Sequence, residues 1–174
     1  ELHLTQFQYG QGLKNKFMSN VNFTRQLVKG KIAETIFSQM FRESGNLTVL
    51  EFGYEKVIPE MIQQGFNESN PMIETLRTAP DFAVIDRDTR QVKLIEVKYQ
   101  RSLSAEYTLK AANRMSQSWN PSYLFIATLD GFYMDEIANI VKNNGKISSL
   151  NHPKINSDLQ DDYLQILKRF EQDN

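Results

Sequence analysis

Two carboxylates and a lysine occupy corresponding positions in two short apolar segments of this 174-residue chain. Asp81 precedes the segment Phe-Ala-Val-Ile, and Glu96 and Lys98 end the segment Leu-Ile-Glu-Val-Lys. Side chains of a strand point alternately to the two faces of its sheet, so Glu96 and Lys98 share a face. The polar residues 86–90 between the segments are typical of a turn, and the whole stretch predicts a β-hairpin.

The apolar residues determine the register of this hairpin, because a slip of one residue would turn them to the other face. When each apolar residue meets another, the opposed pairs are Ile85 with Val92, Ala83 with Leu94, and Asp81 with Glu96. Directly opposed residues have Cβ atoms about 4.5–5.5 Å apart. The register therefore predicts two carboxylates face to face, with Lys98 beside them.

Two carboxylates this close repel each other until one binds a proton or a cation lies between them. Lys98 neutralises part of this charge, and a divalent metal ion neutralises more. Sites built from oxygen ligands suit Mg²⁺ or Mn²⁺ rather than zinc. Charged residues are also common near the ends of hairpin strands, so the spacing alone leaves a surface ion cluster open as an alternative.

Patterns on either side of the hairpin predict the elements that position these residues. Up to the hairpin, these elements are a helix from Thr24 to Gly45 with Asn22 or Thr24 as its N-cap, a strand over 47–58, a loop or short helix over 59–76, and strands over 78–85 and 91–99. After it come a helix from Ser104 to Trp119, a strand over 123–128, a helix near 135–144, and a last helix opened by a Ser157/Gln160 capping box. A strand, helix and strand in succession form a crossover with parallel strands. The chain thus predicts a single α/β domain over 1–174, with a mixed central β-sheet flanked by helices.

The motif Pro80-Asp81, fourteen residues, then Glu96-Val97-Lys98 resembles the PD-(D/E)XK nuclease superfamily, which has the restriction-endonuclease-like fold. The predicted element order is similar to the αβββαβ core of that superfamily over about 24–128. The remainder, about 132–174, is expected to be a C-terminal helical extension.

This resemblance implies a metal-dependent nuclease that hydrolyses phosphodiester bonds, with DNA favoured over RNA as substrate. It implies that Asp81 and Glu96 bind Mg²⁺ or Mn²⁺, with the backbone carbonyl of Val97 as a further ligand, and that Lys98 orients the attacking water or stabilises the transition state. Members of the superfamily often supply a glutamate from the first core helix, and Glu34 is the matching residue here. On a helical wheel Glu34 lies about 20° from Phe41, so it flanks the apolar face.

Basic residues near these positions are candidates for binding nucleic acid. On the helix that follows the motif, Lys110 and Arg114 share a stripe with Tyr107, which could support the site or belong to the core. The other candidates are Lys29, Lys31 and Arg101, and Gln100 is a candidate for supporting Lys98. Ordinary surface charge explains the basic residues equally well.

The net charge of −1 argues weakly against a nucleic-acid-binding protein, but the charge is unevenly distributed. Residues 1–42 carry a net charge of +4 and residues 77–114 carry +3, and these two blocks contain the candidate site residues. Because this local charge is modest, a homodimer or a larger complex is expected to assist binding. Two alternatives stay open: a catalytically silent nuclease-fold module that binds nucleic acid or protein, and an RNA-cleaving toxin domain.

Composition restricts the remaining possibilities. The chain has no cysteine, which excludes disulfides and zinc-thiolate sites and is compatible with a reducing compartment. No apolar run approaches the roughly 18 residues of a membrane span. We therefore expect a cytoplasmic protein with no membrane partner.

Overall fold

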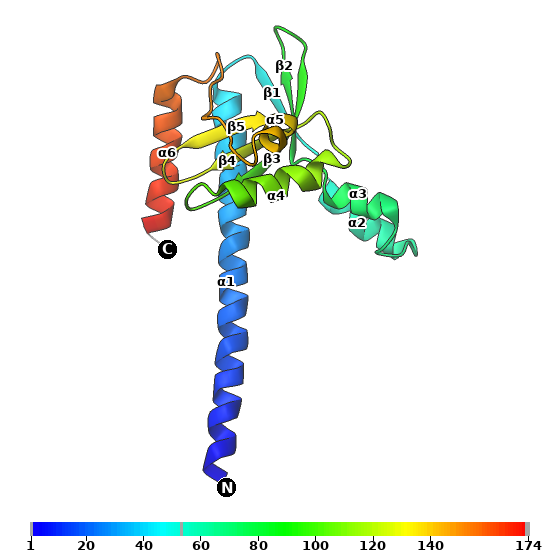
Figure 1. Cartoon of the computed structure of the whole chain (residues 1–174), viewed down its shortest axis with the longest axis vertical. Coiled ribbons are helices and arrows are strands. Elements are labelled where there is room, and N and C mark those ends of the chain that lie inside the picture. Colours follow the sequence, from blue (N-terminus) through cyan, green and yellow to red (C-terminus); the bar gives the residue numbers. More distant parts are fainter. Residues whose placement is uncertain (1, 53, 173–174) are drawn as a thin grey trace.

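The computed structural model describes residues 2–52 and 54–172 and contains a five-stranded mixed β-sheet flanked by helices (Figure 1). Its elements are α1 (Leu2–Glu43), β1 (Leu47–Glu51), α2 (Tyr54–Gln63), α3 (Pro71–Arg77), β2 (Phe82–Asp86), β3 (Val92–Tyr99), α4 (Ala105–Ser116), β4 (Tyr123–Ala127), β5 (Phe132–Glu136), α5 (Ile137–Lys142) and α6 (Ser157–Gln172). The strands lie in the order β1-β2-β3-β4-β5. Only the β3–β4 pair is parallel, as expected for strands joined through the crossover helix α4.

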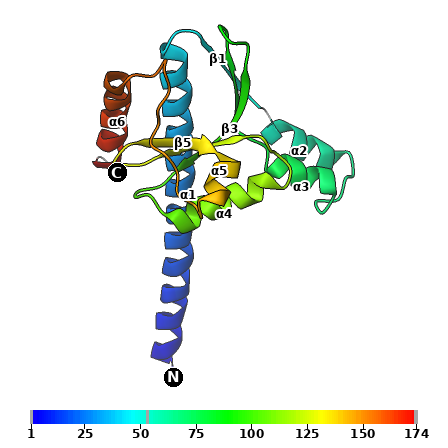
Figure 2. The same ribbon diagram turned by 45° about the horizontal axis from the view of Figure 1, so that its top comes forward.

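Helices cover both faces of the sheet (Figure 2). On one face α1 and α6 pack against the strands, and the phenyl ring centroids of Phe37 and Phe125 lie 4.9 Å apart in this core. On the other face α4 and α5 enclose a smaller core with Leu124 and Ile126 of β4. The β2–β3 hairpin follows the predicted register, with Ile85 opposite Val92 and Ala83 opposite Leu94.

The first helix is longer than predicted. It begins at Leu2, so the predicted start at Thr24 with an Asn22 or Thr24 cap is wrong. The predicted end is confirmed, because Gly45 adopts φ +105, a left-handed conformation that favours glycine. In both views the N-terminal half of α1 extends beyond the sheet (Figures 1 and 2).

The strand predicted over 47–58 ends at Glu51, and α2 begins at Tyr54. The reason is the spacing of the apolar residues after the strand. Val57, Ile58 and Met61 follow Tyr54 by three, four and seven residues, which is helical spacing. Tyr54, Val57 and Ile58 are β-formers individually, but together with Met61 they recur at helical spacing. The loop or short helix predicted over 59–76 resolves into the end of α2 and into α3.

Two corrections concern the C-terminal part. Residues 132–136 form strand β5, so the C-terminal extension is not purely helical. The turn at Asp130-Gly131 joins β4 and β5 into a hairpin, and the prediction did not use this turn signal. The predicted Ser157/Gln160 capping box is wrong, because the side chain of Asn156 accepts the N–H of Leu159 at 2.8 Å. The side chain of Gln160 instead donates to the carbonyls of Leu150 and Ile155.

Candidate functional site

Strand β3 carries the central residues of the site. Ile95 and Val97 point into the core under α1, and the residues between and after them, Glu96 and Lys98, point to the α4 face. This division follows from the alternation of side chains along a strand. Lys98 forms an ion pair with Glu96, and the side chain of Glu96 is only 12% exposed. A largely buried carboxylate does not fit the alternative of a surface ion cluster.

Asp81 lies immediately before β2 and reaches the same end of β3. Its Oδ2 accepts the N–H of Val97 at 2.8 Å, and its carbonyl accepts the N–H of Phe52 at 3.0 Å. These two hydrogen bonds tie Asp81 to the neighbouring strand on one side and to the end of β1 on the other. The structure therefore brings Asp81, Glu96 and Lys98 together as the hairpin register predicted.

The charges of these groups are strongly coupled. Burial and then the charge of Glu96 raise the pKa of Asp81 from 3.8 to about 7, and Lys98 and the Val97 N–H only partly offset them. Burial acts to lower the pKa of Lys98, but the Glu96 and Asp81 carboxylates outweigh it, so the pKa lies above its ordinary value. Lys98 is consequently a cation at neutral pH. Asp81 is only partly ionised there, and added positive charge would favour its ionised form.

The two carboxylates have the chemistry of a site for a divalent cation. Glu96 Oε2 is buried without a hydrogen-bond partner, and such an orphaned oxygen is suited to coordinate a metal ion. Among the described residues, however, no group of three or more His, Cys, Asp or Glu side chains is placed to hold a metal. Val97 contributes its N–H to Asp81, and the role of its carbonyl as a ligand stays a prediction.

Glu34 approaches the pair from α1 and flanks the buried Phe37 and Phe41, as its helical position predicted. Its carboxylate pairs with Lys31 at 2.7 Å, and its side chain is 22% exposed. Its negative charge makes the smallest of the contributions that raise the pKa of Asp81. Glu34 is therefore within electrostatic reach of Asp81 but does not complete a three-carboxylate group.

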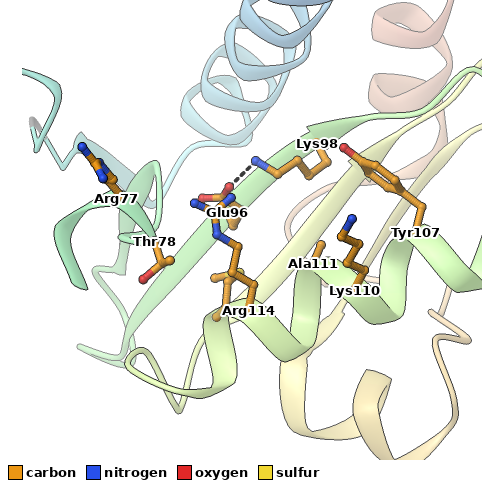
Figure 3. Close-up of a pocket in the computed structure, with 9 residues that line it drawn as sticks. Arg77, Thr78, Glu96, Lys98, Tyr107, Lys110, Ala111 and Arg114 are labelled. Atoms are coloured by element: carbon orange, nitrogen blue, oxygen red, sulfur yellow. Dashed lines mark hydrogen bonds and ion pairs between the residues drawn. The ribbon is translucent and has the colours of Figure 1, made fainter. Parts of the chain in front are cut away.

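A hollow of about 270 Å³ opens beside Glu96 and Lys98, between β3, α4 and the end of α3 (Figure 3). We call it the β3–α4 hollow; the remaining residues that line it are Arg77, Thr78, Tyr107, Lys110, Ala111, Arg114 and Met115. It thus contains four cationic side chains and one carboxylate. Lys110 and Arg114 extend from α4 along one wall, and their role as substrate contacts stays a prediction. Tyr107 lies beside Lys98 and is 50% exposed.

Arg77 and Thr78 were missed by the sequence reasoning. Both come from the C-terminal end of α3, where the carbonyl of Thr75 accepts the indole N–H of Trp119 at 3.1 Å. Arg77 is partly engaged by Glu74 at 2.6 Å and by Glu68 at 3.3 Å. The signal available in the sequence was that Arg77 opens the basic block that contains the motif.

Four other predicted residues lie outside the β3–α4 hollow. Gln100 is buried and accepts the N–H of Ser104 at 2.8 Å while donating to Thr108 at 3.2 Å, so it fixes the first turn of α4. Lys31 is paired with Glu34. Lys29 and Arg101 line a second hollow on the α1–α6 side.

Comparison of the chain with protein-family models, with curated proteins and with solved structures found no match. No helix in the described part of the chain is both long enough and apolar enough to span a membrane.

Proposed function

We propose that the protein is a metal-dependent nuclease that hydrolyses phosphodiester bonds, with DNA as the favoured substrate. One observation carries the proposal: the buried carboxylates of Asp81 and Glu96 and the ammonium of Lys98 converge at the end of β3, beside a cationic hollow. Carboxylates attract a divalent cation, and the surrounding cations attract an anionic substrate. A phosphodiester is the substrate that uses both features.

The arrangement of the elements supports the same function. The chain contains a helix, an antiparallel three-strand unit, a crossover helix and a parallel strand, with α2 and α3 inserted between the first two strands. This order is the one that the resemblance to the PD-(D/E)XK superfamily implies. Asp81 lies immediately before β2, and Glu96 and Lys98 lie within β3, which is compatible with the positions that the resemblance implies.

Asp81 and Glu96 would hold the ion, with Glu34 and the Val97 carbonyl as the further ligands that the resemblance implies. When bound, the ion supplies Lewis-acid stabilisation of the phosphate and lowers the pKa of an attacking water. Lys98 is a cation in this environment, so it stabilises negative charge or orients water and does not act as a base. Lys110, Arg114 and Arg77 bind phosphate oxygens in the hollow.

The alternative with support of its own is a silent nuclease-fold module that binds nucleic acid without cleaving it. It is favoured by the absence of a third carboxylate from the metal-ligand group among the described residues. The two functions differ in what the ion does: cleavage requires it, whereas phosphate binding by Lys110 and Arg114 does not.

A cleavage screen tests the proposal. Purified protein is incubated with single-stranded, duplex and branched DNA and with RNA, each with Mg²⁺, Mn²⁺ or EDTA. We expect metal-dependent cleavage of at least one DNA substrate, and a loss of at least about 100-fold in Asp81→Asn and Glu96→Gln.

Asp162→Asn is the matched control, because Asp162 is an exposed carboxylate on α6. It should cleave at the wild-type rate. Metal-independent binding without cleavage of any substrate would instead identify the silent module, and cleavage of RNA alone would support the toxin alternative.

A further inference from the structure

A second hollow, of about 280 Å³, lies between α1, α6 and the end of β3. We call it the α1–α6 hollow. Its charged lining residues are Arg25, Lys29, Arg101 and Glu171, so three cations share it with one carboxylate. It is separate from the β3–α4 hollow, with which it has no lining residue in common.

Glu171 and Lys29 are both engaged in contacts within the protein. Glu171 accepts the hydroxyl of Tyr99 at 2.7 Å and pairs with Lys29 Nζ at 2.7 Å. Lys29 Nζ also lies 5.5 Å from the centroid of the Tyr99 ring, so these residues tie α1 to α6 and β3. Arg25 and Arg101 are both exposed, and neither forms a salt bridge within the described part of the chain, although the charge of Arg101 acts on Glu171.

Both arginines lie close to the proposed catalytic residues. Arg101 follows Lys98 by three residues, a distance along the chain of at most about 11 Å. Arg25 is nine residues from Glu34 on the same helix, which corresponds to about 14 Å along its axis. Arg101 therefore lies within the span of a few nucleotides from Lys98, on the α1–α6 side of the sheet.

The α1 helix continues this positive charge away from the sheet. Residues 2–33 of the chain contain five Lys or Arg residues, at positions 14, 16, 25, 29 and 31, and no Asp or Glu. The N-terminal half of α1 extends beyond the rest of the molecule (Figure 1). Phe23, 65% exposed, precedes Thr24 of the hollow on α1, and an aromatic ring among cations is typical of surfaces that bind nucleic acid.

We propose that the α1–α6 hollow binds backbone phosphates of the nucleic-acid strand that flanks the cleaved bond, through Arg25 and Arg101. This inference rests on the proposed nuclease function, because a strand that flanks the cleaved bond exists only if the protein cleaves nucleic acid. The proposed binding site itself is not needed for the chemical step. Charge complementarity selects a polyanion as the occupant of a hollow with two available arginines.

Binding in the absence of a divalent metal tests this inference. Fluorescence anisotropy with labelled single-stranded and duplex DNA in EDTA is measured over a series of NaCl concentrations. For Arg25→Gln/Arg101→Gln we expect affinity to fall by on the order of 10-fold, and the slope of log affinity against log salt to decrease by about 1.4–1.8. Lys142→Gln/Lys146→Gln removes two exposed lysines at the end of α5 and should leave both quantities unchanged.

Cleavage under single-turnover conditions at saturating protein separates this inference from the proposed function. The arginine variant should retain the wild-type rate there, because it binds weakly but keeps Asp81, Glu96 and Lys98. An unchanged salt slope in the arginine variant overturns the inference even if the wild type cleaves DNA. A reduced slope supports it even if no substrate is cleaved. Loss of a concentration-dependent dimer in the variant, with unchanged DNA binding, would overturn it in favour of a second copy of the chain.

Discussion

The pair of buried carboxylates, Asp81 and Glu96, is costly for the metal-free protein. The charge of Glu96 disfavours ionisation of Asp81, and one Glu96 oxygen has no hydrogen-bond partner. Lys98 offsets only part of this cost. Unfavourable local charge of this kind is typical of functional sites, where the missing partner is a ligand.

The pKa of Asp81 predicts a specific pH dependence of stability. In the unfolded chain Asp81 loses its proton near pH 3.8, but in the folded protein it does so only near pH 7. The folded protein therefore loses stability as the pH rises from about 4 to 7, because ionisation is easier in the unfolded chain. Asp81→Asn removes this penalty and still offers an oxygen to the Val97 N–H.

In EDTA we therefore expect Asp81→Asn to be more stable than the wild type above pH 7, by on the order of 2 kcal/mol or more, and nearly equal to it at pH 4. Thermal unfolding at several pH values measures the difference. Asp162→Asn, exposed on α6, should show no such pH-dependent gain. A constant difference between Asp81→Asn and wild type at all pH values would contradict the assigned environment of Asp81.

At the scale of elements, the part of the site carried by the hairpin could be predicted and the part carried by α3 could not. Alternation of apolar residues determined the register that places Asp81 beside Glu96, and it needed no information from distant segments. The position of Arg77 depends on a short helix held by a long-range hydrogen bond between Trp119 and Thr75. Local patterns carry no information about such a contact.

The position of α4 matters because it carries Tyr107, Lys110 and Arg114 into the β3–α4 hollow. Gly145, with φ +85, lies against the first turn of this helix, and a Cβ there would be 2.0 Å from the carbonyl oxygen of Ala105. Gly65 has a similar φ of +88 but open space around it. Both glycines therefore have a left-handed backbone conformation, but only at Gly145 would a Cβ clash with a neighbouring residue.

We expect Gly65→Ala to cost about 1 kcal/mol of unfolding free energy, and Gly145→Ala about 3 kcal/mol or more, because the second also forces α4 to move. Chemical denaturation measures both. Gly145→Ala should in addition weaken DNA binding through the displaced Lys110 and Arg114. Equal destabilisation by the two substitutions would show that the contact with Ala105 does not constrain α4.

At the scale of the whole molecule, net charge is a poor guide to function. The total of −1 arises from two basic and two acidic blocks, and the basic blocks supply the cations of both hollows. The charge blocks and the α/β class could be read from composition and periodicity. The extent of α1 could not, because its N-terminal residues are polar with scattered apolar residues and show no continuous helical face.

The proposed function requires that one site, at the end of β3, performs metal-dependent phosphodiester hydrolysis. Substitution of Lys98 tests this requirement most directly, because a cation that stabilises the reaction is needed for cleavage but not for binding the metal ion. The measurement is the single-turnover rate of DNA cleavage with Mg²⁺ or Mn²⁺ for the wild type and for Lys98→Met, purified in parallel. We predict a fall of at least about 100-fold in the variant, with the fold retained by circular dichroism. Cleavage by Lys98→Met at the wild-type rate would contradict the assignment of this site.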